Sequence, residues 1–200
     1  MKLSEEDDPG SKGTCVRPFF LTGLPRSRTA WLANLFTTGE IFCWHDALLL
    51  CGSPADLPQL LRKNAPIGDS DSALILFYPD VAEMFPGSPW VIVERDPQDA
   101  FDSLVKRFGH DVSRGGWPML IAAMQTIPKD DPNVLRVRYE ELNDVEVVRR
   151  IWEHCVPAVE FDERRWALLK RLNVERIPPS SDPARERSMA QELFNRGSLS

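Results

Sequence analysis

The sequence predicts a three-layer α/β fold in which helices flank a central parallel sheet. Two short apolar runs, Val16 to Thr22 and Trp90 to Val93, have the character of strands that are buried on both faces. Each run is followed by a polar turn and then by apolar residues at helical spacing. Repeated strand–helix units indicate a parallel sheet that is covered on both faces, with ligands at the carboxyl ends of its strands.

The later elements continue the same alternation. The first helix begins at Thr29, and the second opens at Pro97, a residue type that is favoured in the first helical turn. A third strand is expected at Val134 to Tyr139, where apolar and charged side chains alternate. Helices are then expected around Val145 to Cys155 and Asp162 to Leu172.

Length and local composition divide the chain into one folded domain and two polar ends. A chain of 200 residues is long enough for a single α/β domain with a substantial core. Residues 1–14 are polar and are expected to form a disordered arm. The domain is expected to cover residues 15–177, and residues 178–200 are expected to form a loop and a short helix.

Charge and cysteine content exclude several classes of protein. A formal net charge of -6 disfavours a general binder of nucleic acid or of membrane surfaces. No apolar run approaches the roughly 18 residues of a membrane span, and the acidic opening differs from a signal peptide. The cysteines lack zinc-ribbon spacing and the histidines form no HExxH motif, so no metal site is predicted. We expect a cytoplasmic protein with reduced thiols.

The segment Leu21 to Leu32, LTGLPRSRTAWL, is the main candidate for an anion site. It joins a buried strand to the start of a helix, where free backbone N–H groups and the helix dipole favour a phosphate. Arg26 and Arg28 can add charged hydrogen bonds. The alternative is a plain strand–helix turn with solvated arginines. No Gly-Lys followed by Ser or Thr occurs, so the segment lacks the Mg²⁺-binding hydroxyl of a Walker A loop.

The stretch Pro25 to Trp31, PRSRTAW, resembles the loop with which sulfotransferases bind the phosphosulfate of 3′-phosphoadenosine 5′-phosphosulfate (PAPS). That loop commonly reads Pro-Lys-Ser-Gly-Thr-Thr-Trp, and four of the seven positions agree. The resemblance implies a P-loop-type fold. It places Arg26 where the family has the lysine that stabilises the leaving phosphate, and Trp31 where a tryptophan packs on adenine. Arg28 and Ala30 depart from the family's glycine and second threonine. The cofactor-binding residues implied here are Arg26, Ser27, Arg28, Thr29, Ala30 and Trp31.

Two further motifs resemble the same family in the same order. Val93 to Ser103 is similar to the 3′-phosphate-binding segment, which implies that Arg95 and Ser103 hold that phosphate. Leu135 to Leu142, LRVRYEEL, is similar to the family's Tyr-Glu-Asp-Leu segment and implies that Tyr139 reaches the adenine amino group. The family's C-terminal Arg-Lys-Gly loop is not evident. The candidates to replace it are Arg185, Arg187 and Arg196, and the alternative for each is a solvated charge of the tail.

Transfer of a sulfuryl group needs a base for the acceptor, and two neighbouring residues can serve. Asp46 falls where some bacterial sulfotransferases carry a catalytic glutamate after the same Thr-Gly. The ordinary pKa of histidine suits His45 to the role at neutral pH. A structural alternative is that Asp46 only caps the helix that follows. The sequence slightly favours Asp46 over His45.

Together these motifs predict a sulfotransferase that uses PAPS without a metal and releases the bisphosphate product PAP. Its acceptor is expected to be a small molecule with a hydroxyl or an amine. A small nucleotide or nucleoside kinase is the alternative enzyme, disfavoured because the loop lacks the hydroxyl that holds Mg²⁺. A non-catalytic nucleotide-binding domain of the same fold is the alternative outside enzymes.

Overall fold

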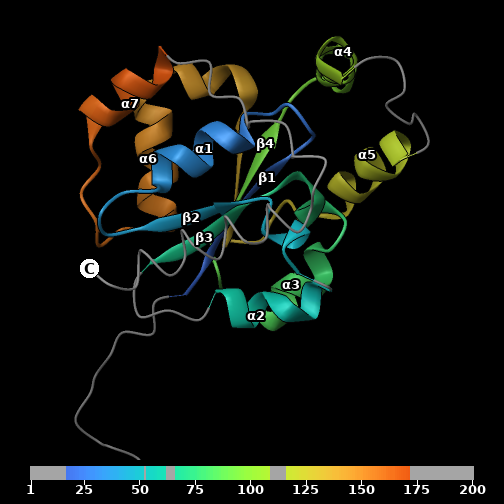
Figure 1. The fold of residues 1–200 in the computed structure, drawn as a ribbon, viewed down its shortest axis with the longest axis horizontal. Coiled ribbons are helices and arrows are strands. Elements are labelled where there is room, and N and C mark those ends of the chain that lie inside the picture. The colour runs from blue at the N-terminus through green and yellow to red at the C-terminus, as the bar shows by residue number, and fades with distance from the viewer. Residues whose placement is uncertain (1–16, 52, 62–65, 109–115, 172–200) are drawn as a thin grey trace, which may run out of the picture.

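The computed structural model describes residues 17–51, 53–61, 66–108 and 116–171, which form one five-stranded sheet with helices on both faces (Figure 1). All strand pairs are parallel, and the strand order is β2-β3-β1-β4-β5. The predicted arm 1–14 and the segment 178–200 lie outside the described residues. The strands are β1 (Phe19–Gly23), β2 (Phe42–His45), β3 (Ile67–Ser70), β4 (Trp90–Glu94) and β5 (Val134–Arg138).

Helices connect the strands. Short 3-10 helices lie in several connections, and Pro97 opens a helix as the sequence predicts. The α-helices are α1 (Thr29–Phe36), α2 (Leu57–Leu60), α3 (Tyr78–Met84), α4 (Pro97–Phe108), α5 (Trp117–Thr126), α6 (Val145–Cys155) and α7 (Glu163–Lys170). The 3-10 helices are η1 (Ala47–Leu49), η2 (Pro54–Asp56), η3 (Ser72–Ile75) and η5 (Tyr139–Asn143).

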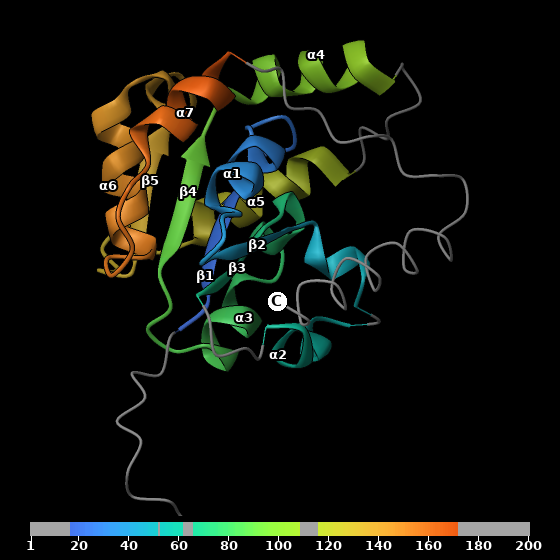
Figure 2. The same cartoon turned by 60° about the vertical axis from the view of Figure 1, so that its left-hand side comes forward.

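Alternate residues of the central strand β1 face different helices. Phe19 and Leu21 pack in one core with α1, α6 and α7, whereas Phe20 packs in a second core with α2 and α3. Val91 and Ile92 of β4 divide between the two cores in the same way. This division follows from the two-residue period of a strand, and it explains the continuous apolar runs of β1 and β4. Figure 2 shows the helices on either side of the sheet and α4 beyond the carboxyl end of β4.

The predicted three-layer α/β fold with a parallel sheet is confirmed, and the strands expected at 16–22, 90–93 and 134–139 correspond to β1, β4 and β5. The sequence pattern does not predict β2 or β3. Strand β3 contains Gly68 and Asp69, two residue types that are depleted in strands. It forms because it lies between β2 and β1, where every residue of its short run is buried. Tyr139 opens η5 and does not end the third predicted strand.

Two glycines are required where other groups approach their Cα atoms closely. A Cβ on Gly68 would overlap the ring of Phe19. A Cβ on Gly23 would lie 2.6 Å from the carbonyl oxygen of Val93. The second clash is with the backbone of the paired strand β4. A backbone atom, unlike a side chain, cannot move away by changing its rotamer. Gly23 therefore lets β1 pair closely with β4 at the point where the chain leaves the sheet.

We expect Gly23→Ala to lower the free energy of unfolding by roughly 1–3 kcal/mol, because the added methyl group must displace the backbone of β4. Unfolding in urea measures this difference. Gly39→Ala is a matched control, since no described atom lies within 4 Å of the position of its Cβ. Equal stability of the two variants would contradict the close approach of β1 and β4.

Candidate active site

The loop of residues 24–28 joins β1 to α1, and it is held by a residue that follows β4. Nη1 of Arg95 donates a hydrogen bond of 2.5 Å to the carbonyl oxygen of Arg26. Nε of Arg26 donates to Oγ of Ser103 in α4 at 3.3 Å. The structure therefore brings together three residues that the sequence singles out in two separate motifs, and it places them at the carboxyl edge of the sheet.

The same loop has a backbone conformation that is rare for arginine. Arg26 and Arg28 have φ angles of 73° and 63°, in the left-handed region that glycine adopts without strain. Between them, Ser27 is fully buried, and its Oγ has no hydrogen-bond partner among the described residues. No side chain caps the start of α1 at Arg28, so the first N–H groups of the helix need acceptors. An oxygen-rich anion in the loop would satisfy both the hydroxyl and these N–H groups.

Tyr139, the first residue of η5, lies beside two guanidinium groups. Cζ of Arg28 is 5.1 Å from the centre of its ring, and Cζ of Arg95 is 4.2 Å away. Nη1 of Arg28 donates to Oδ1 of Asn143 at 3.0 Å, and Nζ of Lys170 donates to the carbonyl oxygen of Asn143 at 2.8 Å. Within the described ranges neither arginine at the ring pairs with a carboxylate. Positive charge thus accumulates beside the loop, as an anionic ligand requires.

Trp31 occupies a more buried place than the sequence suggests. Only 4% of the residue is exposed, and its Nε1 donates to the carbonyl oxygen of Leu169 at 3.1 Å. The indole therefore anchors α1 against α7, and its packing on adenine stays a prediction. Thr29 is buried and Ala30 is half-buried in the first turn of α1.

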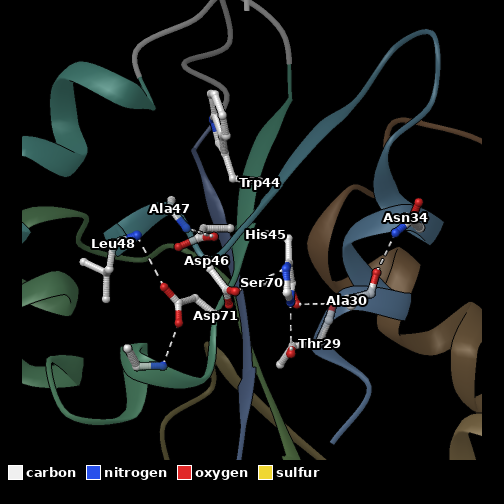
Figure 3. Close-up of polar contacts among 12 residues, drawn as sticks. Thr29, Ala30, Asn34, Trp44, His45, Asp46, Ala47, Leu48, Ser70 and Asp71 are labelled. Carbon is white, nitrogen blue, oxygen red and sulfur yellow. Dashed lines mark hydrogen bonds and ion pairs between the residues drawn. The ribbon is translucent and has the colours of Figure 1, made fainter. Parts of the chain in front are cut away.

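His45 ends β2, and Asp46 begins the turn into η1 (Figure 3). Nδ1 of His45 lies 3.3 Å from Oδ2 of Asp46, and Nε2 lies 3.4 Å from Oγ1 of Thr29. Both side chains of the pair are partly exposed, His45 to 21% and Asp46 to 19%. Asp46 has a φ of 58°, and its side chain does not cap η1. The carboxylate is thus directed to the imidazole, and the imidazole connects it to the start of α1.

Two buried carboxyl groups support the turn that carries Asp46. Oδ1 of Asp69 accepts the N–H of Ala47 at 3.2 Å, and Asp71 accepts the N–H of Leu48 at 3.3 Å. Asp69 is fully buried and Asp71 is 3% exposed. Burial, followed by the charge of Asp71, raises the pKa of Asp69 well above its usual range. Burial, followed by the charge of Asp46, raises the pKa of Asp71 to about 6. The sequence gives no signal for either residue, because both belong to the undetected strand β3 and the turn after it.

Metal-ligand geometry is not found among the residues that the structure describes, where no three His, Cys, Asp or Glu side chains are arranged to hold an ion. None of the helices in these ranges has the length and apolar character needed to cross a membrane. The candidates for the missing C-terminal loop lie outside the described residues; they are Arg185, Arg187 and Arg196.

The comparisons with known proteins bear on the fold. No family model matches the sequence, and no curated protein matches it significantly. Among solved structures, the chain is similar to the crystal structure of mouse sulfotransferase SULT7A1 complexed with PAP, with a TM-score of 0.56 and 17% sequence identity. The match covers 78% of this chain and 64% of that chain, so the protein spans less than two thirds of its neighbour's length. The chain has a sulfotransferase-like fold, as its three motifs predict.

Proposed function

We propose that the protein transfers a sulfuryl group from PAPS to a hydroxyl or an amine of a small-molecule acceptor. The observation that carries this proposal is the contact of Arg26 with both Arg95 and Ser103. It joins the loop that resembles a 5′-phosphosulfate site to the segment that resembles a 3′-phosphate site. One nucleotide with phosphates on both sides of its ribose would span the two. The sulfotransferase-like fold supports the same function.

The proposed nucleotide site uses groups that have no partner among the residues that the structure describes. Oγ of Ser27 and the uncapped N–H groups of α1 would bind the phosphosulfate oxygens. When bound, PAPS supplies a sulfuryl group that is activated for transfer. Arg26 would stabilise the negative charge that grows on the leaving phosphate. Arg95 with Ser103 would hold the 3′-phosphate, and Tyr139 would contact the adenine.

The geometry favours His45 as the base, with Asp46 as the residue that orients it. The slight preference for Asp46 from sequence is thereby reversed in this proposal. Oδ2 of Asp46 can accept the Nδ1–H of His45, which leaves Nε2 deprotonated and directed to Thr29 at the loop. The acceptor proton would pass to Nε2 as the acceptor attacks the sulfuryl group.

A kinase fits these residues less well. Counted from Gly23, the position of the Mg²⁺-binding Ser or Thr in a Walker loop is occupied by Ala30, which has no hydroxyl. The proposed sulfuryl transfer requires no residue in that role.

The first test of the proposed function compares PAP with 5′-AMP by calorimetry. A charged hydrogen bond to the 3′-phosphate contributes about 1.5–3 kcal/mol, so PAP should bind at least roughly tenfold more tightly than AMP. Arg95→Ala should remove most of this difference. Arg138→Ala is a matched control, since Arg138 ends the neighbouring strand β5 and pairs with Glu141. Equal binding of the two nucleotides by the unaltered protein would overturn the proposed function.

A second test separates the roles of His45 and Asp46. We expect His45→Gln to lower turnover on an acceptor with a free hydroxyl or amine by roughly 10² or more, because no group then takes the acceptor proton. Asp46→Asn should lower it less, and the affinity for PAP should change little in either variant. Rapid-quench measurement of sulfuryl transfer gives the turnover of each variant, and calorimetry gives its affinity for PAP. A larger loss in Asp46→Asn than in His45→Gln would return the base to Asp46.

A third test uses the strained backbone at Arg28. Arg28→Gly should leave the free energy of unfolding unchanged or raise it, because glycine relieves a left-handed conformation that is worth about 1–3 kcal/mol of strain. Its affinity for PAP should nevertheless fall, since a guanidinium beside Tyr139 is lost. Urea unfolding and calorimetry on one preparation measure both. A variant that loses stability but keeps its affinity would show that Arg28 serves the fold alone.

A further inference from the structure

Asp71 connects three segments that meet at the candidate active site. Its N–H donates to the carbonyl oxygen of Leu21 at 3.0 Å, and its carbonyl oxygen accepts from Oγ1 of Thr22 at 2.7 Å, which fixes it to the end of β1. Its carboxylate accepts the N–H of Ala73 at 2.7 Å and that of Leu48 at 3.3 Å (Figure 3). Asp71 therefore ties the strand that leads into the loop to the turn that carries Asp46.

The charges around Asp71 are mostly negative. Asp46 faces it from the turn after β2, and Asp69 lies two residues earlier in β3. The nearby thiol of Cys51, whose pKa burial raises to about 11, adds no charge at neutral pH. Among the described residues no Lys or Arg forms an ion pair with Asp71. The N–H groups of Ala73 and Leu48 lower the pKa of Asp71 and so favour its charged form, and the charge of His45 at the end of β2 adds a smaller effect in the same direction. Such an effect is reciprocal, because a carboxylate that is stabilised by an imidazolium stabilises that imidazolium equally.

We propose that Asp71 is a positioning residue for His45 and Asp46: its carboxylate holds the turn that carries Asp46 and stabilises the protonated imidazole of His45. The catalytic part of this inference rests on the proposed function, in which His45 is the base. When Nε2 of His45 takes the acceptor proton, a positive charge forms on the imidazole, and the buried carboxylate of Asp71 offsets it together with Asp46. Asp71 does not need to touch the acceptor, which agrees with its burial.

The experiment is a histidine titration by NMR, which needs neither nucleotide nor acceptor. The chain has three histidines. In Asp71→Asn the titration midpoint of His45 should fall by about one unit, because the turn that holds the carboxylate of Asp46 at 3.3 Å from Nδ1 loses a charged support. His154 is an internal control, since its Nε2 lies 3.0 Å from the carbonyl oxygen of Asn133, away from this turn. An unchanged His45 midpoint in the folded variant would overturn the inference.

A matched variant separates this effect from simple loss of a capping carboxylate. Asp162 also accepts two backbone N–H groups, at the start of α7. Asp162→Asn should leave the His45 midpoint unchanged, and an equal shift in both variants would count against a specific role of Asp71.

The reciprocal variant keeps the inference testable if Asp71→Asn does not fold. His45→Gln changes a partly exposed side chain, and carboxyl-carbon NMR should then show that Asp71 titrates above its value of about 6. An unchanged Asp71 midpoint would overturn the inference. Failure of the proposed function appears separately, as equal binding of PAP and AMP. If transfer activity is present, the acid limb of the kcat profile should move to lower pH in Asp71→Asn, as a smaller pKa of the base requires.

Discussion

The pairing of β1 with β4 is the constraint on which the candidate site depends. Gly23 lies opposite Val93 in this pair, and the absence of a side chain at Gly23 allows the two backbones to meet. Because the strands are parallel, the loop after β1 and Arg95 after β4 emerge at one edge. The chain turns toward β3 and β2 after β1 but toward β5 after β4, so this edge is a topological switch point, where α/β folds bind their ligands.

The strand order also separates charge across the site. Arg26, Arg28 and Arg95 belong to the connections that follow β1 and β4, whereas Asp69 and Asp71 belong to β3 and the turn after it. The three arginines thus follow β1 and its neighbour β4, and the two buried carboxyl groups belong to or follow β3, the other neighbour of β1. An anionic nucleotide is favoured on the side of the arginines. On the second side the carboxyl groups favour the protonated form of His45, which is the state that the proposed base would reach after it accepts a proton.

The sequence predicts the parts of this arrangement that depend on neighbours along the chain. The strands β1, β4 and β5 are apolar or alternating runs, and the motifs around Arg26, Arg95 and Tyr139 are continuous segments. Residues whose roles depend on distant partners leave no such pattern. Asn143 contacts Arg28 across 115 residues, and Asp71 lies after a four-residue strand that contains a glycine and an aspartate. Their positions follow from the sheet order, which local periodicity does not encode.

The loop conformation shows how fold and function compete in this chain. Two arginines adopt left-handed backbone angles next to a buried serine whose hydroxyl has no partner in the described part of the chain, and each feature lowers stability. The surrounding contacts hold the loop in this state: Arg95 binds the carbonyl oxygen of Arg26, and Asn143 binds the side chain of Arg28. A loop shaped only for stability would have glycine at the strained positions and a partner for the hydroxyl. Local rules are thus broken in the same segment where the nucleotide is proposed to bind, and a bound anion there would repair the loss.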